Sequence, residues 1–451
     1  MANARVRPRT PFFLLTVGVC ACSTLGAQAP APPWGLSLQP WPGLRIDAGG
    51  EELKPALRSR DNSLARAAIG AAPGSALLIS AEGYAPRVVV LPGAPSEGGG
   101  SVVGERELGL VALSPAGSEY RLAAAFRTGT QPKAAAFIDR RRVAVPLLDG
   151  PGVDVFDLEA GTSRRIAPPE PYARLGGFVE CLVISERAEL WVSQMTAAAA
   201  HVFSLPDLAY KATVRSGGTW SKVLAWDPAS RRVYLSNWVS EDLSVIDPER
   251  MIEERRVKVG AVPRGMALWP GGAFMYLAQY EIAGAPRGRL LKLDLATMAI
   301  VASIGPEGSK RHVVADPERG RVYVSDMARD LVEIYDARQD RLLADVKVGG
   351  KPNTIALSSD GRLLYVSCRG PNNPDRGYLY KGYEMGRIYV VDLETLSVVE
   401  WWEGGNQPTG LAVSPDGALI ASTDFLDARL RVHRRLGHGT RIPLGEALAE
   451  F

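Results

Sequence analysis

Residues 311–348, RHVVADPERGRVYVSDMARDLVEIYDARQDRLLADVKV, decide the fold. Three polar turn clusters, DPERG (316–320), DMARD (326–330) and DARQD (336–340), divide this stretch into four short runs rich in Val, Leu, Ile and Tyr. Short runs of β-branched and aromatic residues between turn residues are typical of strands. The stretch therefore predicts a small four-stranded sheet, which needs similar neighbours because it cannot bury both of its faces alone.

The same pattern recurs in seven units, each starting at the polar residue that enters the first strand. The steps between starts run from 42 to 56 residues, and an Asp ends most third strands. Second strands repeat as RVYLSN (232–237), FMYLAQ (274–279), RVYVSD (321–326) and LLYVSC (363–368). Such a period with four strands per unit indicates a β-propeller. The seven starts are Lys133, Glu180, Lys222, Arg264, Arg311, Asn353 and Thr409.

The seventh unit lacks a fourth strand of its own. Residues 120–129, YRLAAAFRTG, match the pattern of LLADVKVGG (342–350), a fourth strand that leads into the next unit. If this earlier strand completes the last unit, the ring closes and loses its two exposed sheet edges. The sequence therefore predicts an all-β protein, with a seven-bladed β-propeller over 118–434 closed by an N-terminal strand and a C-terminal tail at 435–451.

The N-terminus has the features of an export signal. Arg5, Arg7 and Arg9 precede the apolar run PFFLLTVGVCA (11–21), which is too short to span a bilayer. We therefore expect a signal peptide at 1–21.

The end of that run resembles a bacterial lipobox. VCAC (19–22) would make Cys22 the lipidated residue, and a cut after AQA (27–29) is the alternative. By the same resemblance, Ser23 in place of Asp implies the outer membrane. We expect a periplasmic or cell-surface lipoprotein, with a linker at 22–33 and the lipid anchor as its one membrane attachment.

Charge argues against a polyanionic partner. The chain has 52 Lys and Arg against 49 Asp and Glu, and three of the arginines lie in the signal segment. A mature chain near neutrality offers no general electrostatic footprint for nucleic acid or an anionic membrane surface. We expect no nucleic-acid binding.

The segment before the propeller, 34–117, differs in kind. Short strand-like runs are broken by Gly and Pro, as in SALLISAEGYAPRVVVLPG (75–93). The pattern LLISAEGYAPRVVVL resembles PEGA-type or carboxypeptidase-regulatory-like modules, which implies a small β-sandwich acting as a spacer.

The propeller repeats resemble the YVTN family, including exported YncE-like proteins. The resemblance is carried by RVYLSN, RVYVSD, LLYVSC and turns such as SPDG (414–417). Further strings, among them GGTWSKV (217–223) and SCRGPNNP (367–374), resemble those of bacterial propeller lipoproteins. A fold shared this widely implies no particular activity.

The unit starts are the candidate ligand site. In a propeller, the connections between units and those between second and third strands open on one face, around the central channel. Four of the seven starts are cationic and one is acidic, which favours a small anionic or polar ligand, or an envelope protein, bound at this face. The alternative is that these side chains solvate the channel and bond backbone groups. Trp220 and His312 flank the ring.

An insertion in the sixth unit lies on the same face. RGPNNPDRGYLYKGYEMG (369–386) carries three tyrosines with polar neighbours, a combination that suits sugar rings, peptides or a protein surface. The alternative is that the insertion is a solvent-exposed loop with no binding role. The residues concerned are Arg369, Asn372, Asn373, Tyr378, Tyr380 and Tyr383.

The catalytic inventory favours a binding or scaffold protein over an enzyme. The four histidines form no metal-binding pair, and no nucleophile elbow, P-loop or haem motif occurs. We expect no metal and no cofactor. One alternative remains, because seven-bladed lactonases resemble these repeats. In that hypothesis His312 is a general base and Arg311 stabilises an oxyanion, with Arg264 and Glu180 nearby.

Overall fold

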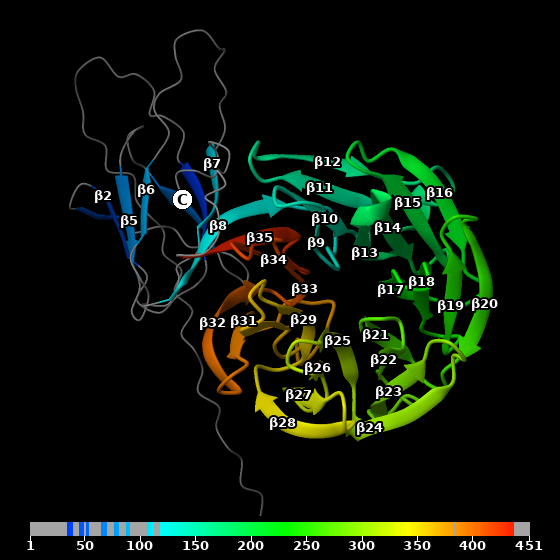
Figure 1. Ribbon diagram of the computed structural model, residues 1–451. Helices are drawn as coiled ribbons and strands as arrows, with labels where there is room; N and C mark the ends of the chain where they lie inside the picture. The colour runs from blue at the N-terminus through cyan, green and yellow to red at the C-terminus, as the bar shows by residue number, and fades with distance from the viewer. Residues whose placement is uncertain are drawn as a thin grey trace, which may run out of the picture. The chain divides into compact units, whose positions relative to one another are not determined.

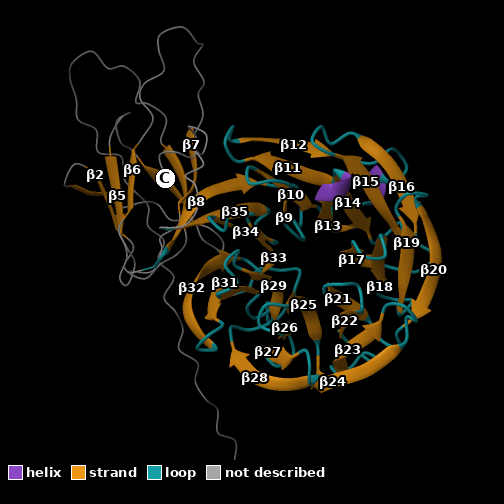
Figure 2. Cartoon of the chain, viewed as in Figure 1, coloured by secondary structure: helices purple, strands orange, loops and turns teal. Residues whose placement is uncertain are grey.

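Seven four-stranded antiparallel sheets surround a common axis (Figure 1), and the protein is an all-β seven-bladed propeller. The computed structural model describes residues 118–382 and 384–436, together with the isolated strands of the N-terminal part. In Figure 2 nearly every regular element is a strand, the exceptions being the single-turn 3₁₀ segments η1 (Ala173–Leu175) and η2 (Ser185–Arg187) within the described residues.

Four consecutive strands, innermost first, make each of the first six blades. Blade one comprises β9 (Ala136–Phe137), β10 (Arg142–Pro146), β11 (Val153–Asp157) and β12 (Thr162–Ile166). Blade two comprises β13 (Phe178–Ile184), β14 (Glu189–Gln194), β15 (Ala199–Ser204) and β16 (Tyr210–Arg215). Blade three comprises β17 (Ser221–Asp227), β18 (Arg232–Asn237), β19 (Asp242–Asp247) and β20 (Ile252–Lys258).

The next three blades follow the same order. Blade four comprises β21 (Pro263–Leu268), β22 (Phe274–Gln279), β23 (Gly288–Asp294) and β24 (Ile300–Gly308). Blade five, the stretch that decided the fold, comprises β25 (Lys310–Asp316), β26 (Arg321–Asp326), β27 (Leu331–Asp336) and β28 (Arg341–Lys347). Blade six comprises β29 (Pro352–Leu357), β30 (Leu363–Cys368), β31 (Gly386–Asp392) and β32 (Ser397–Gly405).

Blade seven closes the ring as the sequence predicts. Its strands β33 (Pro408–Val413), β34 (Leu419–Asp424) and β35 (Arg429–Arg435) are completed by β8 (Tyr120–Arg127), which pairs antiparallel with β35. Tyr120 is buried at this closure; its ring stacks on Trp402 at 4.6 Å, and its hydroxyl lies 3.0 Å from that of Tyr365.

An extra residue interrupts the inner strand of every blade near its start. In blade five, Lys310 pairs with Asp326 and Val313 with Val324, so Arg311 and His312 form a β-bulge. The register shifts at the same place in blades two to four, six and seven, and the Pro132–Leu147 bridge gives blade one the same offset. Bulges re-aim side chains, and here they do so at one end of the channel.

In blades two, three, five and six, a hydroxyl from the second strand secures the bulge to the next blade. The backbone N–H of His312 donates to Ser325 Oγ (3.0 Å), which donates to the backbone oxygen of Asn353 in blade six (2.7 Å). Ser193, Ser236 and Ser367 make the same pair of bonds. The repeated Ser of the RVYVSD-type strings is therefore an inter-blade connection, which satisfies two buried backbone groups.

The N-terminal strands form a separate unit of two sheets. Ile46, Leu77 and Ile79 are buried in it. One sheet has the order β4 (Ala65–Ile69), β1 (Trp34–Leu38), β7 (Arg106–Val111), and the other β3 (Glu51–Leu53), β2 (Arg45–Ala48), β5 (Ala76–Ser80), β6 (Arg87–Val90). The β-sandwich spacer, its likeness to PEGA-type modules and the domain boundaries stay predictions. The signal peptide, Cys22 and Tyr383 lie outside the described residues.

Candidate functional site

The bulges bring the candidate ring together at one end of the inner strands. Lys133, Lys222, Arg264 and Arg311 occupy the first bulge position of their blades, as do Asn353 and Thr409. Glu180 differs, because Val179 holds that position in blade two and Glu180 follows it. The predicted equivalence of Glu180 with the other starts is therefore one residue out of register.

Six charged side chains from six blades interact electrostatically across the axis, which is possible only if they converge there. We call them the central cluster. Five are cationic and one is acidic. The members are Lys133, Glu180, Lys222, Arg264, Arg311 and Arg369.

Crowding and burial shift the protonation of the central cluster. Burial, followed by the charges of Arg264, Lys133 and Arg311, lowers the pKa of Lys222 to about 4. Burial and Arg311 likewise hold the pKa of Lys133 well below its ordinary value. Burial raises the pKa of Glu180 to about 7. Burial and mutual repulsion therefore disfavour the charged form of both lysines, and Lys222 is neutral near pH 7.

The guanidiniums remain charged at neutral pH. Burial, reinforced by Arg311, lowers the pKa of Arg264 to about 9, and burial together with Arg311 lowers that of Arg369 to about 10. The guanidinium of Arg311 donates from Nε to the side-chain oxygen of Asn353. Three charged arginines thus share one small space with a single carboxyl group, an arrangement that attracts an anion.

Aromatic residues that sequence reasoning missed line the central cluster. Each is the first residue after a second strand: Trp238 after β18, Tyr280 after β22 and Phe425 after β34. Lys222 Nζ lies 3.6 Å from the Trp238 ring centroid, Arg311 Cζ 5.4 Å from that of Tyr280, and Lys133 Nζ 4.8 Å from that of Phe425. Their repeated place after strings such as RVYLSN was the available signal.

Several polar atoms here are buried without a hydrogen-bond partner among the described residues. They include Arg264 Nη1, Trp238 Nε1 and His312 Nδ1. Arg264 is itself buried, and Arg264 Cζ lies 5.3 Å from the Trp238 ring centroid. An unpaired buried donor is costly, so these atoms favour binding of an acceptor that reaches the cluster.

The blade-six insertion is fastened beside the central cluster. Gln407 accepts from Arg369 Nε (3.1 Å) and donates to the backbone oxygen of Tyr378 (2.6 Å), while Lys381 pairs with Asp427 of blade seven. Arg369 Cζ lies 5.1 Å from the Tyr378 ring centroid. The insertion therefore provides a wall of the site.

The remaining candidates differ in their exposure and in their hydrogen bonds. Trp220 and Tyr380 are exposed, and Tyr380 stacks on Arg376 at 3.6 Å. Asn373 is structural, because it donates to Lys381 O and accepts from the backbone of its own loop. Thr409 bonds to Pro132 O (3.2 Å) and Thr423 Oγ1 (3.1 Å), and Asn372, partly buried, has an unpaired Oδ1.

His312 lies beside the central cluster but is a weak base. Burial, followed by Arg264 and Arg311, lowers its pKa to about 4, so it is neutral at pH 7. Within the part of the chain that the structure describes, no group of three or more His, Cys, Asp or Glu side chains is placed to hold a metal ion.

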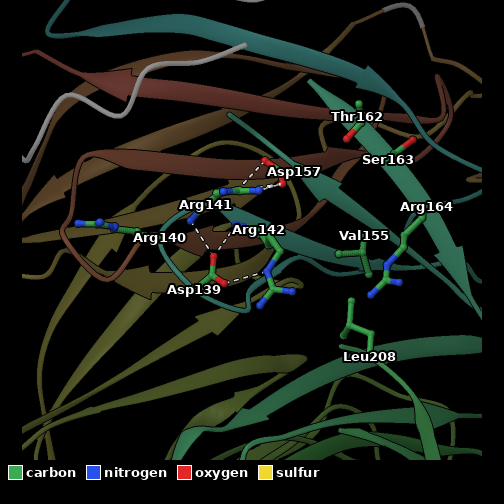
Figure 3. Close-up of a pocket in the computed structure, with 10 residues that line it drawn as sticks. All are labelled: Asp139, Arg140, Arg141, Arg142, Val155, Asp157, Thr162, Ser163, Arg164 and Leu208. Carbon is green, nitrogen blue, oxygen red and sulfur yellow. Dashed lines mark hydrogen bonds and ion pairs between the residues drawn. The ribbon is translucent and has the colours of Figure 1, made fainter. Parts of the chain in front are cut away.

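A separate cavity of about 610 Å³ lies between blades one and two (Figure 3). Most of its lining residues lie in or beside the connections between first and second strands and between third and fourth strands. The cavity therefore opens on the face opposite to the central cluster. Arg141 pairs with Asp157 and Glu159, and Arg142 pairs with Asp139. Arg164 donates to the backbone oxygen of Asp207 (2.5 Å), and Arg140 also lines the cavity. Carboxylates thus balance the charge of two of its four arginines, unlike the arginines of the central cluster.

The fold and the central cluster define a seven-bladed propeller with a cationic, aromatic-lined cluster on its axis. The chain is 48% identical over 330 residues to antigen Lp49 of Leptospira interrogans, a match that spans 73% of this chain and 72% of that protein. The chain therefore belongs to the family of antigen Lp49.

More distant proteins share the propeller. The YncE proteins of Salmonella typhi and Salmonella typhimurium are each 24% identical over 163 residues, or 35% of this chain and 44% of theirs. A chain of hydrazine synthase from Kuenenia stuttgartiensis superposes with a TM-score of 0.58 at 16% identity, covering 68% of this chain and 97% of that one, which shows the fold alone. No protein-family model matches the chain.

Proposed function

We propose that this protein is an exported, lipid-anchored propeller that binds an anionic small molecule, or an acidic group of an envelope protein, at the central cluster. The observation that carries the proposal is an excess of buried cationic groups with unpaired donors. Arg264 Nη1 and Trp238 Nε1 have no partner among the described residues. A carboxylate or phosphate supplies acceptors to both and offsets the arginine charges.

A purely structural ring explains only part of this arrangement. Asn353 Oδ1 accepts from Arg311, and the Thr409 hydroxyl bonds to Pro132 and Thr423. By contrast, no hydrogen-bond acceptor contacts Lys222 Nζ within the described residues, and its nearest neighbours are aromatic rings and cations. A cluster that only filled the channel would gain stability from apolar replacements, so its retention favours a ligand.

The binding proposal is tested by thermal unfolding in citrate or galacturonate at constant ionic strength. Both anions should raise Tm of the wild-type chain. Arg264→Gln should weaken the binding by about 10- to 100-fold, because it removes a charged hydrogen-bond donor. Arg338→Gln, on an exposed turn, serves as the matched control and should bind like wild type. Binding unchanged by Arg264→Gln contradicts the proposal.

Export and anchoring rest on the sequence of the first 33 residues. The lipobox-like VCAC places Cys22 as the lipid attachment point, with the outer membrane as the expected location. Within the described residues, none of the helices has the length and apolarity that a membrane span requires. Metabolic labelling with a fatty-acid analogue should mark the chain, and Cys22→Ser should abolish the label; a labelled Cys22→Ser chain overturns the anchor.

A lactonase is the second candidate, favoured by His312, whose Nδ1 has no hydrogen-bond partner among the described residues and which lies near Arg264 and Arg311. In that mechanism Arg264 or Arg311 stabilises the developing oxyanion while His312 accepts a proton from water. Assays with gluconolactone distinguish the two: a binding protein shows no turnover above background, whereas turnover lost in His312→Ala identifies a lactonase.

A further inference from the structure

The amine of Lys222 occupies an unusual place in the central cluster. Lys222 is only 5% exposed, and its Nζ lies 3.6 Å from the ring centroid of Trp238 and 5.5 Å from that of Trp220. No carboxylate pairs with it among the described residues. The other lysine as deeply buried in this part of the chain, Lys310, is paired with both Asp326 and Glu333.

The surroundings of Lys222 favour a free amine. Burial is the largest cause, and Arg264, Lys133 and Arg311 add repulsion, so the pKa of Lys222 is lowered to about 4. The face of Trp238 favours the charged form and offsets part of this effect. A lysine that is desolvated or placed beside other cations is a nucleophile near pH 7, and condenses with carbonyl groups.

We propose that Lys222 is a carbonyl-reactive amine that captures small oxo acids as a reversible imine, with the guanidiniums of Arg264 and Arg311 holding their carboxylate. The inference rests on the proposed anion site and names its ligand class. It follows from a partnerless amine, a desolvating pair of indole rings and two carboxylate-binding side chains in one cluster.

The chemistry balances without a cofactor. The Lys222 nitrogen attacks the carbonyl carbon of the oxo acid and forms a carbinolamine. Loss of one water then leaves the C=N bond of the imine, whose nitrogen takes up a proton from solvent to give the iminium form that a hydride donor reduces. Addition of water reverses both steps and releases the oxo acid unchanged.

Trp220 covers the approach to the amine. It is 44% exposed, has a left-handed backbone (φ 62°) and ends the connection that contains Gly217 and Gly218. Its ring centroid lies 6.0 Å from that of Trp238, so removing it should open Nζ to solvent on one side while the Trp238 ring remains. Trp220→Ala should therefore be labelled faster than wild type, provided that Lys222 is the reacting group.

The test treats the full chain with pyruvate and sodium cyanoborohydride near pH 6.5. The reductant delivers hydride to the imine carbon and makes the bond permanent, so the mass rises by one pyruvic acid less one oxygen atom. We expect one such addition per chain, mapped by peptide mass spectrometry to Lys222. Exposed lysines such as Lys258 and Lys347 lack the burial and the cationic neighbours of Lys222 and should react far more slowly.

Three variants and one alternative reagent complete the design. Lys222→Met should abolish the addition, Arg264→Gln should slow it, and Arg338→Gln should leave it unchanged. Acetone, which lacks a carboxylate, should label Lys222 much less than pyruvate does. Addition spread over surface lysines, addition at Lys133 instead, or equal labelling by acetone overturns the inference.

The result also separates this inference from the anion site on which it rests. If citrate raises Tm through Arg264 but pyruvate leaves Lys222 unmodified, the anion site stands and the imine is refuted. If citrate has no effect and no addition occurs, both proposals fall.

Discussion

Lys222 places an amine where burial and three cationic neighbours all oppose its charge. In the unfolded chain this lysine is protonated up to about pH 10.5, whereas in the folded protein it is neutral above about pH 4. The unfolded state therefore binds more protons throughout that window, so this residue makes the folded protein less stable at lower pH and the penalty shrinks as pH rises. A group kept at such a cost indicates a functional rather than a structural residue.

Lys222→Met should therefore stabilise the protein at pH 7, by about 1–3 kcal/mol, because Met retains the apolar stem and carries no proton to lose. The gain should be larger at pH 6 than at pH 9. Urea unfolding at these three pH values measures it, with Lys258→Met as a control at an exposed site. A variant that is less stable than wild type, or a difference independent of pH, shows that Lys222 is charged and paired in the folded protein.

The bulge and its serine explain how much of the site the sequence could predict. Lys222, Arg264 and Arg311 were found because each follows the same offset from a recognisable second strand. Glu180 was placed one position early because blade two has the apolar Val179 at the first bulge position. The sequence could not predict that Lys222 has no carboxylate partner among the described residues, because this depends on distances between blades, which no local sequence pattern contains.

The inter-blade hydroxyl is testable in blade five. Ser325→Ala leaves the backbone N–H of His312 and the backbone oxygen of Asn353 unpaired, and Ser325 is fully buried. We expect a loss of about 1–3 kcal/mol in the free energy of unfolding. Ser325→Thr is the matched control, because blade seven uses Thr423 to accept from the Gly410 N–H. Equal losses for both variants point to steric effects instead of the hydrogen bonds.

Blade four offers the reverse change, because Ala278 stands where the second strands of blades two, three, five, six and seven have Ser or Thr. A hydroxyl at this position comes close to Gly265, which itself packs against the backbone of His312 and Arg311. Ala278→Ser therefore tests whether an inter-blade hydrogen bond can be added to blade four. An increase in Tm supports the role of the hydroxyl as a general inter-blade bond, and a decrease shows that blade four is packed too closely to accept it.

The whole ring depends on a strand that comes before the first blade. The central cluster draws charged residues from six blades, so an opening anywhere in the ring moves those residues apart. Closure was predictable because YRLAAAFRTG has the pattern of a fourth strand and the seventh unit lacks one. The contacts that stabilise the closure were not predictable, because Tyr120 packs on Trp402 and Tyr365, which lie far from it in the sequence.

Two truncations separate the closing strand from everything before it. A chain beginning at Ser118 keeps β8 and should unfold like the propeller of the full-length protein. A chain beginning at Gly129 loses β8, exposes the edge of β35 and gives up the burial of Tyr120, Leu122 and Ala124. That loss should cost on the order of 5 kcal/mol or more, and the open edge should promote self-association. Scanning calorimetry and light scattering measure both effects.

Because the central cluster needs a closed ring, the chain beginning at Gly129 should also lose the stabilisation by citrate. If that chain still responds to citrate, the anion site lies away from the axis.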